Sequence, residues 1–249
     1  MNGLTDMNQQ ETLGRIARER IRMLELPAIA PAIVERFNQL GDLTGTISDV
    51  GDSLGIICVV PAAVLQPVAG SKRIVGPALT MRNIVRRSQV YKAVVDGSNT
   101  MGEMDAHYLA RPGDVLVIEG LTGCSNMGGQ SASIGKRQGE IGAIIDGTVR
   151  DPDQYQKLGW SVWCRGFTPI TGKWRLETVE INGPVHIAGI QCNPGDLVCA
   201  DRAGVCLVPR QAVEQVLELC EKYDKADAAR QADIDAGMPM LELASKKYK

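Results

Sequence analysis

The feature that most constrains the fold is a series of short apolar, β-branched runs separated by turns and helical patterns. Three of these runs cover residues 55–60, 73–85 and 113–120, and a helical pattern over 88–99 lies between the second and the third. Later runs predict strands at 140–146, 160–166, 178–189 and 195–209. Strands that alternate with helices in one chain favour an α/β domain.

Helical patterns predominate at both ends of the chain. Residues 9–24 carry spaced apolar side chains among Arg and Glu, which predicts an amphipathic helix. A second helix is expected from Pro31 to near Gly41, and a third, short helix is expected to be capped by Ser48 or Asp49. A long helix is predicted over 211–236. We therefore expect N-terminal helices in 1–41, an α/β domain in 42–210 and a helical extension in 211–249.

Composition narrows the classes of partner. Lys and Arg number 27 against 29 Asp and Glu, and no basic run stands out except the short tail, so no nucleic-acid partner is expected. No stretch approaches the roughly 18 consecutive apolar residues of a membrane span. The N-terminus lacks the apolar core of a signal peptide, so a cytoplasmic location is expected.

The seven cysteines are scattered and form no C-x-x-C pair. This pattern predicts neither a zinc site nor a disulfide framework, and it is typical of reduced thiols. A nucleophilic cysteine would need His107 or His186 as its imidazole partner.

The first candidate ligand loop lies within 120–139, where Gly128 and Gly129 precede a predicted helix. The first amides of that helix, those of Gln130, Ser131 and Ala132, are expected to point unpaired toward an anion. An ordinary helix start is the alternative. A P-loop is excluded, because five residues instead of four separate Gly129 from the next glycine and Arg137 replaces the required Ser or Thr.

The second candidate loop is the stretch IIDGTVRDPDQY, residues 144–155, in which a strand ends at Arg150 and Asp151. Local physics favours a structural interpretation: Asp151 as a helix N-cap, Pro152 at the first helical position and Gln154 completing a capping box. Arg150 does not fit this interpretation, because a cation at a helix N-terminus faces the positive end of the helix dipole. A negative partner is therefore expected near Arg150.

The stretch GGQSASIGKRQGEIGAIIDGTVRD resembles the signature of the metal-dependent 4-hydroxy-4-methyl-2-oxoglutarate / 4-carboxy-4-hydroxy-2-oxoadipate aldolases. That signature is a glycine, twenty residues, Arg-Asp, two residues, and Glu or Asp; here Gly129 and Arg150 enclose twenty residues. Similar framework segments extend over residues 42–212. The same fold includes regulators of ribonuclease E activity and proteins mislabelled as demethylmenaquinone methyltransferases.

The resemblance implies a single-domain α/β fold of the ribonuclease-regulator-like, swivelling β/β/α type with N- and C-terminal helices. It also implies a cytoplasmic homotrimer or homohexamer that cleaves 2-oxo acid substrates to pyruvate and decarboxylates oxaloacetate. Asp151 would hold Mg²⁺ or Mn²⁺, and Arg150 would face the developing enolate oxygen. Gly128, Gly129 and the amides of residues 130–132 would receive the substrate carboxylate.

The sequence departs from the signature at its last position. Gln154 stands where the family has Glu or Asp, although Asp153 is adjacent, and an amide cannot act as a general base. Two alternatives therefore stay open: a non-catalytic regulator of the ribonuclease E type, and a hydrolase or hydratase on the same metal site. A Schiff-base lysine is a rival chemistry, for which Lys136 is the residue in these loops.

Overall fold

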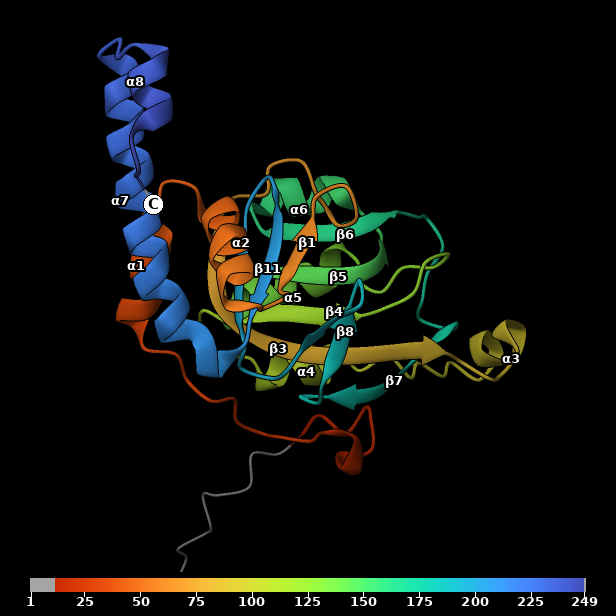
Figure 1. The fold of residues 1–249 in the computed structure, drawn as a ribbon. Helices are drawn as coiled ribbons and strands as arrows, with labels where there is room; N and C mark the ends of the chain where they lie inside the picture. Colours follow the sequence, from red (N-terminus) through yellow and green to blue (C-terminus); the bar gives the residue numbers. More distant parts are fainter. Residues whose placement is uncertain (1–11, 249) are drawn as a thin grey trace, which may run out of the picture.

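The computed structural model describes residues 12–248, which form a mixed α/β domain around one nearly closed, barrel-like sheet (Figure 1). The strands of the main sheet follow the order β1-β11-β10-β3-β4-β5-β6-β2, and β7 pairs with the free part of β3. Their bounds are β1 Val59–Pro61, β2 Gln66–Pro67, β3 Ile74–Val85, β4 Val115–Glu119, β5 Gly142–Val149, β6 Ser161–Phe167, β7 Leu176–Ile181, β10 Leu197–Ala200 and β11 Gly204–Val208. A separate hairpin joins β8 Val185–Ile187 to β9 Ile190–Cys192.

The long strand β3 joins two differently built halves of the sheet. Its first residues, 74–77, pair antiparallel with β10, and residues 78–82 pair parallel with β4. Strands β4, β5 and β6 continue the parallel half. The carboxyl ends of parallel strands lie at one edge of a sheet, where α/β proteins place their ligands.

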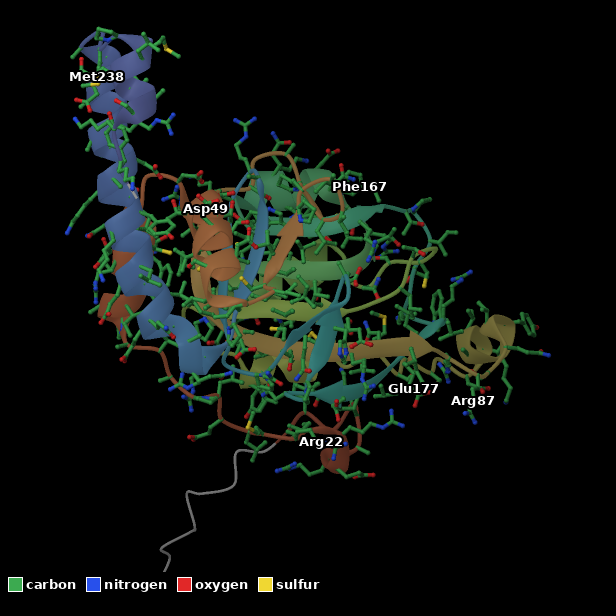
Figure 2. All side chains as sticks on the ribbon, in the orientation of Figure 1. Arg22, Asp49, Arg87, Phe167, Glu177 and Met238 are labelled. Atoms are coloured by element: carbon green, nitrogen blue, oxygen red, sulfur yellow. The ribbon has the colours of Figure 1, made fainter. Side chains whose placement is uncertain are left out.

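The helices divide between the two halves. The parallel strands are followed by α3 Val90–Val95, α4 Glu103–Leu109, α5 Gly129–Gln138 and α6 Pro152–Leu158. The antiparallel half packs against α1 Pro31–Gln39, α2 Leu43–Leu54 and α7 Val213–Asp235. Helix α7 continues away from the sheet toward α8 Met240–Ser245, and Met238 lies at this remote tip (Figure 2). None of the helices in residues 12–248 is long and apolar enough to cross a membrane.

Four clusters of buried apolar side chains pack the helices and the strands against one another. The largest lies under α4, α5 and α6 and includes Leu116, Ile145 and Tyr155. The seven cysteines are all free and buried, and every cluster contains at least one of them. These free thiols agree with the expectation of reduced cysteines, and all of them are buried.

The predicted helix over 9–24 is wrong for its described part, residues 12–24, which holds one turn of 3-10 helix at Arg18–Arg20. The segment instead runs beside β7, where the amide of Arg22 donates to the carbonyl of Ile181 and its guanidinium pairs with Glu180 (2.6 Å). Ile16 and Ile21 are buried. Tertiary contacts therefore override the helical periodicity, and Figure 2 shows Arg22 below the sheet. Residues 9–11 lie outside the described residues.

The predicted caps at Ser48 or Asp49 are also wrong, because both residues lie inside α2. The helix begins nearly two turns earlier, where the Asp42 side chain accepts a hydrogen bond from the amide of Gly45. The run at 178–189 does not form one strand, because Asn182 adopts a left-handed conformation (φ 53°) between β7 and β8. The run at 195–209 also divides, into the antiparallel strands β10 and β11, and the other predicted strands and helices occur near their expected positions.

Candidate functional site

Two neighbouring strand-to-helix junctions form the candidate site. Strands β4 and β5 are parallel partners, with Glu119 opposite Asp146. From β4 the chain passes through residues 120–128 into α5, and from β5 it passes through Arg150 and Asp151 into α6. Residues of both junctions line one cleft of about 540 Å³.

Asn126 fixes the longer junction to β5. Its side-chain amide donates to the carbonyls of Leu121 (2.7 Å) and Thr148 (3.1 Å), and its side-chain oxygen accepts from the amide of Leu121. Its own backbone amide donates to Thr148. The side chain is fully buried, so these bonds are shielded from water and hold the loop against the strand.

The carbonyl of Met127 is the point at which the two junctions are joined. It accepts hydrogen bonds from the amide of Arg150 (3.0 Å), the hydroxyl of Ser125 (2.7 Å) and the hydroxyl of Tyr155 (3.0 Å). Burial raises the pKa of Tyr155, so this phenol stays protonated and remains a donor. The start of α5 is thereby held in register with Arg150.

Asp151 does not cap its own helix as the capping interpretation predicts. It adopts a left-handed conformation (φ 60°, ψ 49°), and within the described structure its side chain makes no capping bond to α6. Its Oδ2 instead accepts from the amide of Gly129, the first residue of α5 (3.0 Å). The carboxylate is therefore directed across the cleft at the neighbouring helix. Non-glycine residues rarely adopt this conformation, and Asp and Asn are among those that tolerate it.

Gly129 is a glycine because the two helix starts meet there. A Cβ at this position would lie 2.5 Å from Cγ and 2.7 Å from Cβ of Gln154. The stem of Gln154 thus packs against the backbone of α5, and Gln154 is not among the residues that line the cleft. The expected capping box, like the expected cap, is not formed by the described residues.

The amides at the start of α5 are partly free, as expected. Those of Gln130 and Ser131 find no hydrogen-bond acceptor among residues 12–248. The amide of Ala132 does not fit the expectation, because it donates to the carbonyl of Gly128 (3.1 Å) and so closes the first turn. Two donors therefore remain for an anion, close to the amide that Asp151 already occupies.

The charge of the cleft is mixed. Arg150, Arg15 and Lys173 bring three cations, and Asp151 and Glu103 bring two carboxyl groups. Among the described residues no carboxylate lies within 4 Å of the Arg150 guanidinium, so the negative partner expected near Arg150 is not a side chain of this part of the chain. An unpaired, half-buried guanidinium next to free amides is suited to an anionic ligand.

Glu103, Arg15 and Lys173 are cleft residues that sequence reasoning missed. Burial raises the pKa of Glu103, and in the described structure its Oε2 is buried without a hydrogen-bond partner. These residues come from α4, from the N-terminal segment and from the loop after β6, so no local motif connects them.

A buried polar chain also reaches the cleft. The hydroxyl of Ser131 lies 2.8 Å from Nε2 of His107, and Nδ1 of His107 lies 2.7 Å from Oε1 of Glu140. The side chains of His107 and Glu140 are fully buried, whereas Ser131 lines the cleft. Sequence reasoning named Ser131 for its amide and missed its side chain.

The structure provides little for the rival nucleophiles. Lys136 lies on α5 away from the cleft and donates to the carbonyl of Leu158. Burial raises the pKa of Cys124, the cysteine nearest to the site in sequence, which favours an unreactive thiol. His107 bonds to Ser131 and Glu140 and not to a cysteine, and His186 is exposed.

Comparison with known proteins gives a consistent result. A family model described as RraA-like, aldolase/RraA, matches residues 44–207. A protein of Halalkalibacterium halodurans named "Putative 4-hydroxy-4-methyl-2-oxoglutarate aldolase" is 31% identical over 206 residues, which cover 82% of this chain and 90% of that protein.

Two solved structures share the fold. An uncharacterized protein from Pseudomonas syringae pv. tomato superposes with a TM-score of 0.72 at 25% identity, covering 88% of this chain and 99% of that one. Streptomyces coelicolor RraAS2, described as an unusual member of the RNase ES inhibitor RraA protein family, superposes at 0.65 with 25% identity, covering 86% and 99%. The segment matched by the family model, residues 44–207, contains both junctions and the main sheet except Val208, the last residue of β11. On these grounds the chain belongs to the RraA-like aldolase/RraA family.

Proposed function

We propose that this cleft binds a divalent cation and cleaves 4-hydroxy-2-oxo acids to pyruvate. The observation that carries the proposal is that one cleft brings together the unpaired guanidinium of Arg150, the carboxylate of Asp151 and two free amides of α5. Substrates of this class bring both an anionic carboxylate and an oxo group. The cleft has complementary groups for each of them.

The chemistry of the reaction explains why these groups are needed. When the bond between C3 and C4 of the substrate breaks, its electron pair moves to the 2-oxo oxygen and leaves an enolate. Fixed positive groups that face this oxygen stabilise the charge more in the transition state than in the substrate. Arg150 serves this role in the proposal, and the amides of Gln130 and Ser131 bind the substrate carboxylate.

The donor set fits a hard cation that is held mostly by water and substrate. Asp151 Oδ1 has no donor among the described residues, which also contain no group of three or more His, Cys, Asp or Glu arranged to enclose a metal. Mg²⁺ commonly uses one or two carboxylates and retains several waters. Asp151 would hold Mg²⁺ or Mn²⁺, which would polarise the 2-oxo group as a Lewis acid.

The names of two relatives, both putative 4-hydroxy-4-methyl-2-oxoglutarate aldolases, support the aldolase proposal. Oxaloacetate decarboxylation is proposed as a side activity because it passes through the same enolate. A regulatory binding role is the second candidate, favoured by the similarity to the Streptomyces coelicolor member of the RNase ES inhibitor RraA protein family. A regulator acts through its surface and needs no turnover. Metal-dependent cleavage therefore separates the two candidates.

The deciding experiment is a screen of 4-hydroxy-2-oxo acids with Mg²⁺ and with Mn²⁺, following pyruvate release. We expect turnover with at least one substrate, loss of turnover after exhaustive chelation, and its return when either cation is added. Turnover that survives chelation would refute the metal mechanism. A protein without turnover on the whole series would favour the regulatory role.

A further inference from the structure

The polar chain Ser131–His107–Glu140 connects the cleft to the interior of the domain. It runs from the first turn of α5 to α4, and then to Glu140, which lies between α5 and β5. Both links are short, at 2.8 Å and 2.7 Å. A hydroxyl at the substrate end is therefore linked to a buried carboxylate through an imidazole ring.

The geometry gives this chain a direction. With Glu140 ionised, Nδ1 of His107 carries the hydrogen and donates it to Glu140, and Nε2 accepts the hydrogen of the Ser131 hydroxyl. The lone pairs of the Ser131 oxygen then remain available to the cleft. In this state Ser131 can receive a proton from a ligand while it passes its own proton to His107.

Helix α5 is built to leave room for this pair. A Cβ at Gly135 would lie 2.6 Å from Oε2 of Glu140 and 3.0 Å from Cε1 of His107. Glu140 is further fixed by its backbone, because its amide donates to Gly135 and its carbonyl accepts from the indole of Trp160. The imidazole and the carboxylate therefore have little freedom to change partners.

A purely structural role does not explain why His107 and Glu140 are buried together. A carboxylate and an imidazole that are fully buried lose their hydration, and apolar side chains of similar size would stabilise the fold at least as well. Within the described structure, Oε2 of Glu140 is also left without a hydrogen-bond partner. The chain moreover ends in the cleft, beside the free amides of Gln130 and Ser131.

The proposed reaction requires a general base that the family signature does not supply here. Gln154 replaces the signature acid, and its stem is packed against Gly129 instead of lining the cleft. We propose that Ser131 fills this role as the catalytic acid–base group, with His107 and Glu140 as the residues that position and activate it. This inference rests on the proposed function.

The proton transfers balance within a single turnover. Ser131 Oγ takes the proton of the substrate C4 hydroxyl while its own proton moves to Nε2 of His107. The C4 oxygen forms the new carbonyl, the bond between C3 and C4 breaks, and its electron pair leaves the pyruvate half as an enolate. The reverse transfer then delivers the proton to C3 and restores Ser131 and neutral His107, so no further reactant is consumed.

Two reactions of the same site allow a clean test. Retro-aldol cleavage needs a base for the C4 hydroxyl before the bond can break, whereas decarboxylation of oxaloacetate gives the same enolate without a base, and in the absence of Ser131 that enolate takes its C3 proton from solvent. In Ser131→Ala we expect retro-aldol turnover to fall by roughly 10²–10⁴-fold, the usual contribution of general acid–base catalysis. Decarboxylation of oxaloacetate should stay within about threefold of the wild type. Ser133→Ala, two residues along α5 and outside the cleft lining, should change neither rate.

The positioning role of His107 needs a second variant. His107→Asn keeps a donor for Glu140, and its shorter side chain places no acceptor at the position of Nε2, so it should lower retro-aldol turnover and spare decarboxylation, as Ser131→Ala does. An activity-independent measurement accompanies it. The chain has two histidines, so ¹⁵N spectra of the imidazoles are simple, and Ser131→Ala should shift the Nε2 signal of the buried ring and leave the exposed ring unchanged.

The outcomes of these experiments distinguish the acid–base role of Ser131 from the aldolase function itself. If Ser131→Ala lowers both reactions equally or lowers neither, the acid–base role is refuted while the aldolase assignment stands. An unchanged imidazole spectrum in Ser131→Ala would refute the hydrogen-bonded chain itself. A wild-type protein that cleaves no 4-hydroxy-2-oxo acid would refute the proposed function, and this inference with it.

Discussion

The two strand-to-helix junctions start from adjacent parallel strands and differ in almost everything else. The junction before α5 is long, carries no charged residue between Gly120 and Gly129, and is held in place by Asn126. The junction before α6 consists of Arg150 and Asp151, with Asp151 in a left-handed conformation. One contributes neutral amide donors and the other contributes both charges.

This difference shows how a small site can combine groups that would interfere with each other on one loop. A cation beside free amides on a single helix start would repel them, because the helix dipole is positive there. Here the guanidinium belongs to one junction and the open amides to the other. The carboxylate of Asp151 crosses between the junctions to the amide of Gly129, so the charges are kept in a fixed relation to the donors.

The largest expected effect comes from Asp151→Asn. The amide keeps a side-chain oxygen for Gly129 and tolerates the left-handed conformation, so thermal unfolding should change little. It loses the negative charge that a hard cation requires, so metal-dependent pyruvate release should fall to the background rate. A variant that folds normally and retains turnover would reduce Asp151 to a cap for α5.

The next largest effect is expected for Arg150→Lys. Lysine keeps the charge and loses the planar, forked donors, so turnover should drop by roughly 10²–10³-fold, close to the loss in Arg150→Ala. The kcat values of the two variants with a 4-hydroxy-2-oxo acid provide the comparison. A lysine variant near the wild-type rate would make Arg150 a distant counter-charge.

Gly129→Ala tests the contact between the junctions. The added Cβ would lie 2.5 Å from Gln154 Cγ, so the two helix starts must move apart. We expect a loss of about 1–3 kcal/mol in the free energy of unfolding, as for other overpacked sites. Urea denaturation measures it, and Ser133→Ala, expected to change this free energy by about 0.5 kcal/mol or less, is the control on the same helix. Equal midpoints for the two variants would contradict the contact.

The smallest effect concerns an aspartate that does cap its own helix. Asp42 accepts from the amide of Gly45 at the start of α2, so Asp42→Ala should reduce the free energy of unfolding by about 0.5–2 kcal/mol. Asp42→Asn should retain most of this stability, because Asn caps about as well. The contrast with Asp151→Asn, which spares stability and removes turnover, separates a capping aspartate from a functional one.

Sequence reasoning located the charged junction better than the neutral one. Arg150 and Asp151 could be found because a strand, a glycine spacing and a proline all fall within a short stretch. The free amides of Gln130 and Ser131 followed from the expected helix start. The hydrogen bond from Gly129 to Asp151 could not be predicted, because it joins two helices whose relative position only the sheet defines.

The errors have the same origin. The apolar spacing at the N-terminus fitted an amphipathic helix. In the structure Ile16 and Ile21 are instead buried in the core beside β7, from an irregular segment. His107 and Ser131 are 24 residues apart and meet because α4 packs against α5. Local pattern predicts single elements well, whereas contacts between elements depend on the complete fold.

The distribution of the buried thiols allows local unfolding of the domain to be followed by thiol labelling. Cys164 belongs to the cluster under α5 and α6, Cys192 to the cluster beside β8 and β9, and Cys124 to the small cluster beside the cleft. The remaining four, Cys58, Cys199, Cys206 and Cys220, lie where α2 and α7 meet the sheet. Because all seven thiols are buried, an alkylating reagent modifies each of them only when the apolar cluster that contains it opens. The order in which the seven cysteines are alkylated therefore records the order in which the four apolar clusters open, without any introduced probe.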